Sequence, residues 1–262
     1  MFSKNASNNA KGVAIFCVMF FHLVQMKKLP IDSFYSFFAT ASVSFFLIAS
    51  GYGLTNSYLK SGINNFFLKR IKAVYIPFAL ATVILSLVKG FIPDNISSVV
   101  RTITFLAPEL PVDGTMWYIY YIAVLYVVFY FSFSICERYS INTAFALLMI
   151  LGFSVLMYNI SLPTKYNLIG TLFSFHAFSF PVGVLLGMIK IKDNKIIKIY
   201  HYAIIILFLM MFASLKIQPS MIKFTVTSVL FGLALISIFE VIKVNGAIIT
   251  FLGAYSYEAY LF

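Results

Sequence analysis

The sequence predicts an all-α integral membrane protein, a multi-span helical bundle with about nine transmembrane helices of which the last is incomplete. Composition is the first reason. Of the 262 residues, 61% are hydrophobic and only 10% are charged, and the mean hydropathy is +0.96. Soluble domains average roughly 45–50% apolar and about 25% charged residues. The second reason is that long apolar stretches recur along the chain between short hydrophilic gaps, so most of the chain is expected to lie in lipid.

A helix needs about 17–25 mainly apolar residues to cross a bilayer, and each apolar stretch can be tested against that length. Eight stretches predict complete helices, at residues 10–26, 34–57, 73–92, 115–136, 142–159, 167–189, 201–215 and 222–242. A ninth begins near Ala247 and stops with the sequence at Phe262. We therefore expect a single transmembrane domain over residues 1–262 that lacks its C-terminal end.

The cationic residues predict the orientation of these helices. Twelve of the 19 Lys and Arg lie near the N-terminus or in the even-numbered connections, and seven lie in the odd-numbered ones. Because Lys and Arg are enriched in cytoplasmic loops, the N-terminus is expected in the cytoplasm. The same distribution explains the net charge of +11 by topology and not by binding of nucleic acid.

Ionisable side chains inside a membrane are costly, so each one is a candidate functional group. Lys11 and His22 are eleven residues apart in the first predicted helix. At 100° and 1.5 Å per residue they lie about 20° apart around the axis and roughly 16 Å apart along it, so they share a face. This arrangement suits a tunnel in which an anionic donor binds at Lys11 and His22 transfers a proton. The alternative is that Lys11 only sets topology and His22 hydrogen-bonds a neighbouring helix.

Other polar positions have simpler interpretations. We expect His176 to be an interhelical hydrogen-bond donor and His201 to be an interfacial anchor. Glu109 and Asp113, in the longest connection, form a solvated loop face or contact a sugar acceptor. The glycines of the Gly-x-x-x-Gly motif at residues 183–187 are expected to bring two helices close together. The two cysteines, Cys17 and Cys136, lie in apolar runs and are expected to be small core residues.

Five segments, in the same order along the chain, resemble the motifs of one family. They are Lys11-Gly12 followed by His22, Phe46-Leu47-Ile48-Ala49-Ser50-Gly51-Tyr52, Phe67-Leu68-Lys69-Arg70-Ile71-Lys72-Ala73-Val74-Tyr75-Ile76-Pro77, Met116-Trp117-Tyr118-Ile119, and Phe251-Leu252-Gly253-Ala254-Tyr255-Ser256-Tyr257-Glu258-Ala259-Tyr260-Leu261. In this order they resemble the acyltransferase-3 family of bacterial integral membrane acyltransferases. The family commonly has Arg-x-x-Arg in its third helix, whereas here Ala73 follows Arg70 at that spacing, so Lys69 or Lys72 would supply the second charge.

The resemblance implies transfer of an acyl group, usually acetyl, from acyl-coenzyme A to a hydroxyl of a cell-surface polysaccharide or lipid-linked glycan. It implies a bacterial cytoplasmic (inner) membrane location, a donor of the acetyl-CoA type, and no metal. His22 would act as general base or form an acyl-histidine, and Glu258 would orient it or stabilise its imidazolium.

The donor site implied by the same resemblance is cationic. Coenzyme A carries a pyrophosphate and a further phosphate, which Lys and Arg bind through charge-assisted hydrogen bonds. The candidate donor-binding residues are Lys11, Lys69, Arg70, Lys72, Ser50 and Gly51. Helix packing is the alternative interpretation of Ser50 and Gly51.

Two other functions fit the same composition. A membrane carrier or flippase for a lipid-linked sugar or small solute is the main alternative, although the sequence has no internal repeat of the kind that many transporters carry. A non-catalytic remnant or subunit is the other. Labelled acetyl-CoA would separate the enzyme from both, because only the enzyme forms a labelled ester.

Overall fold

The computed structural model describes residues 2–27, 33–92, 95–106, 112–159, 167–189, 193–218, 220–243 and 246–261, and it contains no strand within these ranges. The helices are α1 (Lys4–Met26), α2 (Ser33–Ser61), α3 (Phe66–Arg70), the π-helix η1 (Ile71–Tyr75), α4 (Ile76–Val88), α5 (Ile96–Ile103), the short 3₁₀ helix η2 (Gly114–Met116), α6 (Trp117–Arg138), α7 (Thr143–Asn159), α8 (Asn167–His176), α9 (Ser179–Met188), α10 (Asn194–Ile217), α11 (Met221–Ile242), α12 (Ala247–Ala254) and α13 (Ser256–Leu261). The predicted all-α class is confirmed.

Six helical stretches among the described residues are long and apolar enough to cross a membrane. They are Lys4–Met26, Ser36–Ser61, Phe66–Val88, Gly114–Arg138, Asn194–Leu215 and Met221–Ile242. Two shorter apolar stretches, Thr143–Asn159 and Leu172–Met188, accompany them. The chain is therefore an integral membrane protein, and the predicted count of nine spans is not confirmed.

The predicted helix at 167–189 is broken in two. Helix α8 ends at His176 and α9 begins at Ser179. Pro181 has no backbone N–H, so it cannot donate to the carbonyl of Ala177 one turn earlier. The last predicted helix is also divided, into α12 and α13 on either side of Tyr255. Hydropathy gave no sign of either break, because both segments remain mainly apolar on the two sides of the break.

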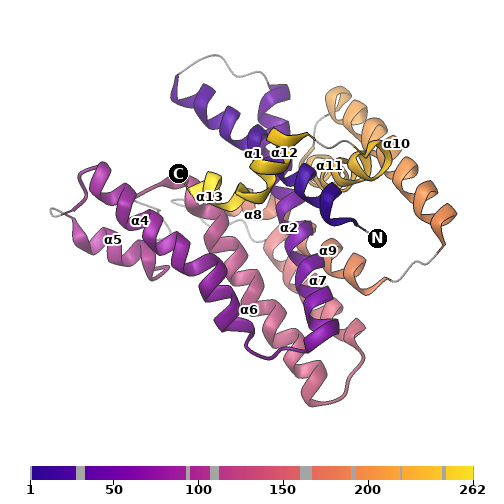
Figure 1. Cartoon of the computed structure of the whole chain (residues 1–262), viewed down its shortest axis with the longest axis horizontal. Helices are drawn as coiled ribbons and strands as arrows, with labels where there is room; N and C mark the ends of the chain where they lie inside the picture. The colour runs from indigo at the N-terminus through magenta and orange to yellow at the C-terminus, as the bar shows by residue number, and fades with distance from the viewer. Residues whose placement is uncertain are drawn as a thin grey trace.

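Helix α2 lies in the middle of the bundle and contacts α1, α9 and α11, with α10 and the α4–α5 pair at opposite sides (Figure 1). The contact between α2 and α9 depends on glycine. A Cβ on Gly51 would lie 2.4 Å from the carbonyl oxygen of Phe180, and one on Gly183 would lie 2.1 Å from that of Ile48. A Cβ on Gly187 would lie 2.6 Å from Thr55. The packing role predicted for the glycine motif at 183–187 is confirmed.

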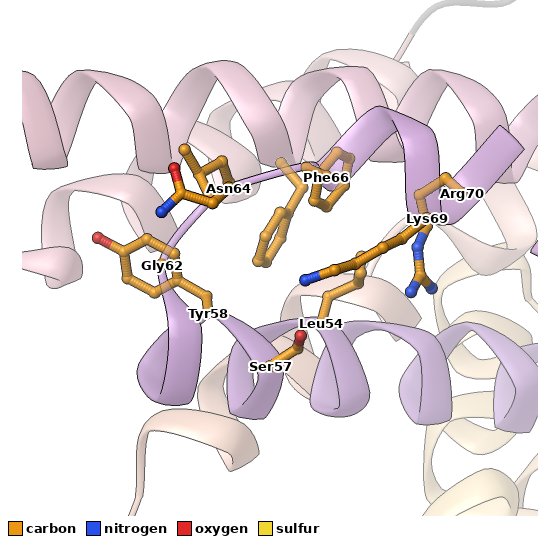
Figure 2. A pocket seen from close by; sticks show the side chains of 10 residues that line it. Leu54, Ser57, Tyr58, Gly62, Asn64, Phe66, Lys69 and Arg70 are labelled. Atoms are coloured by element: carbon orange, nitrogen blue, oxygen red, sulfur yellow. The ribbon is translucent and has the colours of Figure 1, made fainter.

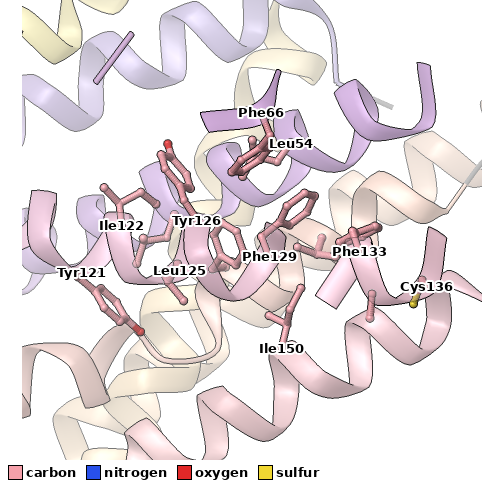
Figure 3. Close-up of a cluster of buried hydrophobic side chains, with 14 residues drawn as sticks. Leu54, Phe66, Tyr121, Ile122, Leu125, Tyr126, Phe129, Phe133, Cys136 and Ile150 are labelled. Atoms are coloured by element: carbon pink, nitrogen blue, oxygen red, sulfur yellow. The ribbon is translucent and has the colours of Figure 1, made fainter. Parts of the chain in front are cut away.

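The largest apolar cluster surrounds α6, as Figure 3 shows. Tyr121, Leu125, Phe129 and Phe133 project from α6 toward α2, α3, α7 and α9. Cys136 is buried at the end of this cluster and Cys17 is partly buried in α1, and both are free thiols. The prediction that the cysteines are small core residues agrees with this placement. Helix α10, in contrast, exposes large side chains such as Ile199 and Met210, which suits a surface that faces lipid.

Candidate active site

An inner cavity of about 170 Å³ lies between α1, α2, η1, α6 and α13. Its walls are mainly hydroxyl-bearing and aromatic side chains. The lining residues are Lys11, Val18, Val43, Phe46, Ser50, Val74, Tyr118, Ile122, Tyr126, Ser256, Tyr257 and Tyr260. A cavity with several hydroxyl groups among membrane-spanning helices is a candidate site for a polar substrate.

A second cavity, here called the mouth cavity, lies at the N-terminal end of α1 and has a volume of about 340 Å³. It is lined by the beginning of α1, by α2 and by one residue of α11. The lining residues are Phe2, Ser3, Lys4, Ser7, Asn8, Lys11, Phe45, Ile48, Ala49, Tyr52 and Ile236. Among the residues that the structure describes, Lys11 alone lines both cavities. Its partly buried side chain therefore lies where the mouth cavity meets the inner cavity.

The face of α1 that carries Lys11 continues toward His22. Val18, two turns after Lys11, lines the inner cavity, and His22 follows Val18 by one further turn. Residues four apart in a helix lie one above the other on the same face. The predicted alignment of Lys11 with His22 along one stripe thus coincides with the wall of the inner cavity.

Two groups interact with His22. Asp113, the residue just before η2, acts on it electrostatically, and the side chain of Gln25 in the same helix forms a hydrogen bond with it. Asp113 is held in place on both of its oxygens. Its Oδ2 accepts from Lys89 Nζ at 2.8 Å, and its Oδ1 accepts from the backbone N–H and the hydroxyl of Thr115 at 2.8 and 2.7 Å. Lys89 Nζ also donates to the carbonyl of Val112 at 2.9 Å.

These contacts keep Asp113 charged. Burial by itself raises the pKa of the Asp113 carboxyl, but the hydrogen bonds from Lys89 and Thr115 outweigh burial and bring the pKa below its ordinary value. A fixed negative charge is therefore present near His22 at neutral pH. Such a charge favours the imidazolium over the neutral imidazole, as the intermediate of general base catalysis requires.

Glu258, the carboxylate predicted to orient His22, is exposed on α13. The first and last helical segments do pack together, since α1 contacts both α12 and α13, and Thr250 Oγ1 donates to Asn9 Oδ1 at 2.7 Å. Glu258 acts electrostatically on Tyr257, its neighbour in sequence. The structure thus shows an electrostatic effect of Asp113 on His22, and the pairing of Glu258 with His22 stays a prediction. Glu109 lies outside the described residues.

The tyrosines of the inner cavity come from two helices far apart in sequence. Tyr118 and Tyr126 lie on α6, and both interact with the hydroxyl of Ser50. Tyr257, on α13, donates to the carbonyl of Val74 in η1 at 2.7 Å. The fourth, Tyr260, donates to the carbonyl of Thr115. A sequence signal for them existed, because three of these four tyrosines lie within motifs that resemble the family, but spacing alone did not bring α6 and α13 together.

Ser50 and Gly51 are adjacent in α2 but serve different surfaces. Ser50 lines the inner cavity. Gly51 is buried against α9, where its missing Cβ lets the two backbones approach. Of the predicted pair, only Ser50 is placed to contact a bound group.

The predicted basic cluster is located at the junction of α3 and η1. Lys69 and Arg70 line a small pocket with Ser57 and Tyr58 of α2, and Figure 2 shows the two cationic side chains on one side of it. The Arg70 Cζ lies 5.8 Å from the ring centroid of Tyr126, which links this pocket to the wall of the inner cavity. Its Nε is buried and has no hydrogen-bond partner within the described part of the chain.

Lys72 is exposed on η1, one turn beyond Lys69. A π-helical turn holds one extra residue and therefore changes the direction of the side chains that follow it. Pro77, just after this turn, removes a further helical hydrogen bond. The irregular backbone between Ile71 and Pro77 separates the basic cluster on one side from the apolar α4 on the other.

The remaining histidines, His176 and His201, are both buried. His176 Nδ1 and the hydroxyl of Ser44 lie 2.8 Å apart, and the ring stacks on Trp117 at a centroid distance of 5.7 Å. His201 Nδ1 lies 3.0 Å from the hydroxyl of Ser237. The expected interhelical role of His176 agrees with its contact to α2. His201 is 3% exposed and hydrogen-bonded to α11, so the interfacial anchor expected at this position is a buried interhelical contact instead.

No group of three or more His, Cys, Asp and Glu side chains that could hold a metal ion occurs among the residues that the structure describes. The groups present can instead bind an anion, accept a proton and position a hydroxyl. Lys11, Arg70 and Lys69 supply positive charge, His22 supplies an imidazole on which the Asp113 carboxylate acts electrostatically, and the tyrosines supply hydroxyl walls.

Together, fold and site define an integral membrane protein with a cation-lined cavity and a hydroxyl-lined cavity, and Lys11 lies in the wall of both. Comparison with family models identifies the family to which this membrane protein belongs. The Acyl_transf_3 model, described as an acyltransferase domain, matches residues 4–262, essentially the whole chain. The chain belongs to this acyltransferase family and is a membrane acyltransferase. No curated protein and no solved structure gives a significant match to it.

Proposed function

We propose that this protein is a membrane O-acyltransferase that transfers an acetyl group from acetyl-CoA to a hydroxyl of a cell-surface polysaccharide or lipid-linked glycan. The observation that carries this proposal is the position of Lys11, in the wall of both cavities and on the same face of α1 as His22. A donor bound in the mouth cavity could extend past Lys11 into the inner cavity, toward the imidazole.

Charge supports the donor side of the proposal. The phosphates of coenzyme A are anions, and the mouth cavity carries Lys4 and Lys11, while Lys69 and Arg70 lie at the neighbouring pocket. The buried Nε of Arg70 has an unused donor, which a phosphate oxygen would satisfy. With the N-terminus in the cytoplasm of a bacterial inner membrane, all four cations lie on the side where acetyl-CoA is present.

In the proposed reaction His22 acts as the general base. The imidazole takes the proton of the acceptor hydroxyl, the oxygen attacks the thioester carbonyl, and the C–S bond breaks to release coenzyme A, which takes up the proton from the imidazolium. Asp113 stabilises that imidazolium. An acyl-histidine intermediate is the alternative, in which the acetyl group is first transferred to His22 and then to the hydroxyl.

The direct test uses membranes that contain the protein, acetyl-CoA labelled in its acetyl group, and the host glycan. The wild-type protein is expected to form labelled ester in the glycan, and His22→Ala is expected to abolish it. Phe16→Ala is the matched control, because Phe16 is on α1 but 56% exposed toward lipid, and it should retain full transfer.

Each outcome discriminates between functions. Undiminished transfer by His22→Ala would remove His22 from the mechanism. A wild-type protein that forms no ester but moves a lipid-linked sugar across the membrane without coenzyme A would instead be a carrier.

A further inference from the structure

The walls of the inner cavity are fixed by contacts outside it. Tyr257 and Tyr260 bond to the backbone carbonyls of Val74 and Thr115, in η1 and η2. Tyr118 and Tyr126 both interact with Ser50, and Arg70 lies over the Tyr126 ring. Side chains tethered in this way cannot rotate out of the way of a ligand without breaking a buried hydrogen bond, which costs about 1–3 kcal/mol. The inner cavity therefore has a defined size.

The two cavities differ in size in a way that matters for the donor. The mouth cavity has a volume of about 340 Å³ and the inner cavity one of about 170 Å³. Between them lie Lys11 and the neighbouring rings of Phe45 and Phe46, whose centroids are 5.5 Å apart. Phe45 lines the mouth cavity and Phe46 lines the inner cavity. A donor that threads from one to the other must fit its terminal group into the smaller space.

We propose that the inner cavity is the acyl-binding chamber and that Phe46, set among the tethered tyrosines, limits the transferred group to a short acyl chain. This inference rests on the proposed function, since it assumes an acyl thioester as donor. Each additional methylene must find space among walls that are already held in place. Discrimination of one methylene by an apolar wall is typically about 10–200-fold, and Phe46, Val43 and Ile122 form the apolar part of this wall.

Phe46 is the best position at which to test the size limit. Unlike the tyrosines it makes no hydrogen bond, so its truncation adds space and leaves no polar group unpaired. Phe38 provides a matched control, because it lies on the same helix and is a partly buried ring packed against the same apolar cluster. It packs on Phe212 and Phe231 and does not line either cavity.

The experiment is an internal competition between acetyl-CoA and octanoyl-CoA for one acceptor, with the two ester products measured together. A cavity of about 150 Å³ holds a benzene molecule, so the inner cavity has room for a few carbons but not for an eight-carbon chain. The ratio of products does not depend on how much of the protein is folded. Phe46→Ala is expected to raise the octanoyl to acetyl ratio by about tenfold or more, and Phe38→Ala should leave it at the wild-type value. Val43→Ala, a smaller change in the same wall, should raise the ratio less.

The possible outcomes are distinct. If the wild-type protein transfers neither group, the proposed function itself fails. If it transfers acetyl but Phe46→Ala and Val43→Ala keep the wild-type ratio, the function stands and the size limit is wrong. An equal rise in Phe38→Ala would also overturn the inference, because the effect would then come from loosened packing and not from the chamber wall.

Discussion

The same arrangement of a polar residue followed by glycine occurs in two helices, as Lys11-Gly12 in α1 and as Ser50-Gly51 in α2. In each, the polar residue lines the inner cavity and the glycine next to it packs on another helix. A Cβ on Gly12 would lie 2.0 Å from the carbonyl oxygen of Ile249 in α12, and one on Gly51 would lie 2.4 Å from that of Phe180 in α9. The polar side chain is therefore held at the cavity by a close backbone contact one residue away.

The similarity extends to the partner helices, which contribute a glycine of their own. Gly253 of α12 meets the backbone of Asn8, and Gly183 of α9 meets the backbone of Ile48. Successive residues of a helix point about 100° apart, so one helix can present a functional side chain to the cavity and a bare backbone to its neighbour. Small residues at both sides of a contact are the usual means of close helix packing in membranes.

The two contacts differ in their surroundings. Helix α9 is mostly buried, including Phe180, Gly183, Val184 and Gly187. Helix α12 has only Gly253 buried, and Ile248 and Phe251 are 76% and 62% exposed. The same clash should therefore be more costly at α9, where the partner helix has no room to move, than at α12. The free energy of unfolding of glycine variants at the two contacts can therefore be compared.

The largest effect is expected for Gly51→Ala. Its new Cβ would clash with the backbone of α9, and because α9 is mostly buried, the variant should lose about 3 kcal/mol of stability or fail to fold. Gly53→Ala is the control on the same helix, since nothing lies within 4 Å of the added Cβ and helix propensity alone would favour the alanine. The thermal unfolding temperature in detergent measures both. An unfolding temperature of Gly51→Ala equal to that of Gly53→Ala would show that the close contact does not stabilise the bundle.

The second largest effect is expected at Lys11, where a substitution should change acyl transfer and leave helix packing intact. Lys11→Met keeps the length of the side chain and removes its charge, so acetyl transfer from acetyl-CoA should fall about 100-fold, which corresponds to about 2.7 kcal/mol. The thermal unfolding temperature should stay close to the wild-type value, because Lys11 makes no ion pair within the described residues. Lys11→Arg should retain a large part of the activity. Equal activity of Lys11→Met and the wild-type protein would remove Lys11 from donor binding.

The sequence predicted features that depend on the periodicity of a single helix, and it did not predict contacts between segments that are distant in the chain. The shared face of Lys11 and His22 follows from helix geometry alone, and Val18 lines the cavity on that face. Ser50 was also predicted, from a motif. The grouping of Asp113 with His22 could not be predicted, because it depends on how the loop before α6 is held by Lys89 at the end of α4.

The same distinction explains why two of the predicted helices are divided in the structure. An apolar stretch predicts how much chain can lie in a membrane, but not whether that chain is one helix. Pro181 was visible in the sequence, yet a proline in a membrane helix is tolerated often enough that it does not by itself predict a break. Tyr257 and Tyr260 contact η1 and η2, and these contacts depend on the separate direction of α13.

The smallest effect is expected for Gly12→Ala, and it is the sharpest test of the comparison. By distance alone this clash is the more severe, because the added Cβ would lie 2.0 Å from its neighbour against 2.4 Å for Gly51→Ala. Because α12 is short and mostly exposed, it can shift outward into lipid, and we expect a loss of only about 1–2 kcal/mol in the same unfolding assay. The hydrogen bond from Thr250 to Asn9 would be stretched by this shift and accounts for part of the loss. A loss for Gly12→Ala that equals or exceeds the loss for Gly51→Ala would mean that distance of approach, and not the freedom of the partner helix to move, determines the cost.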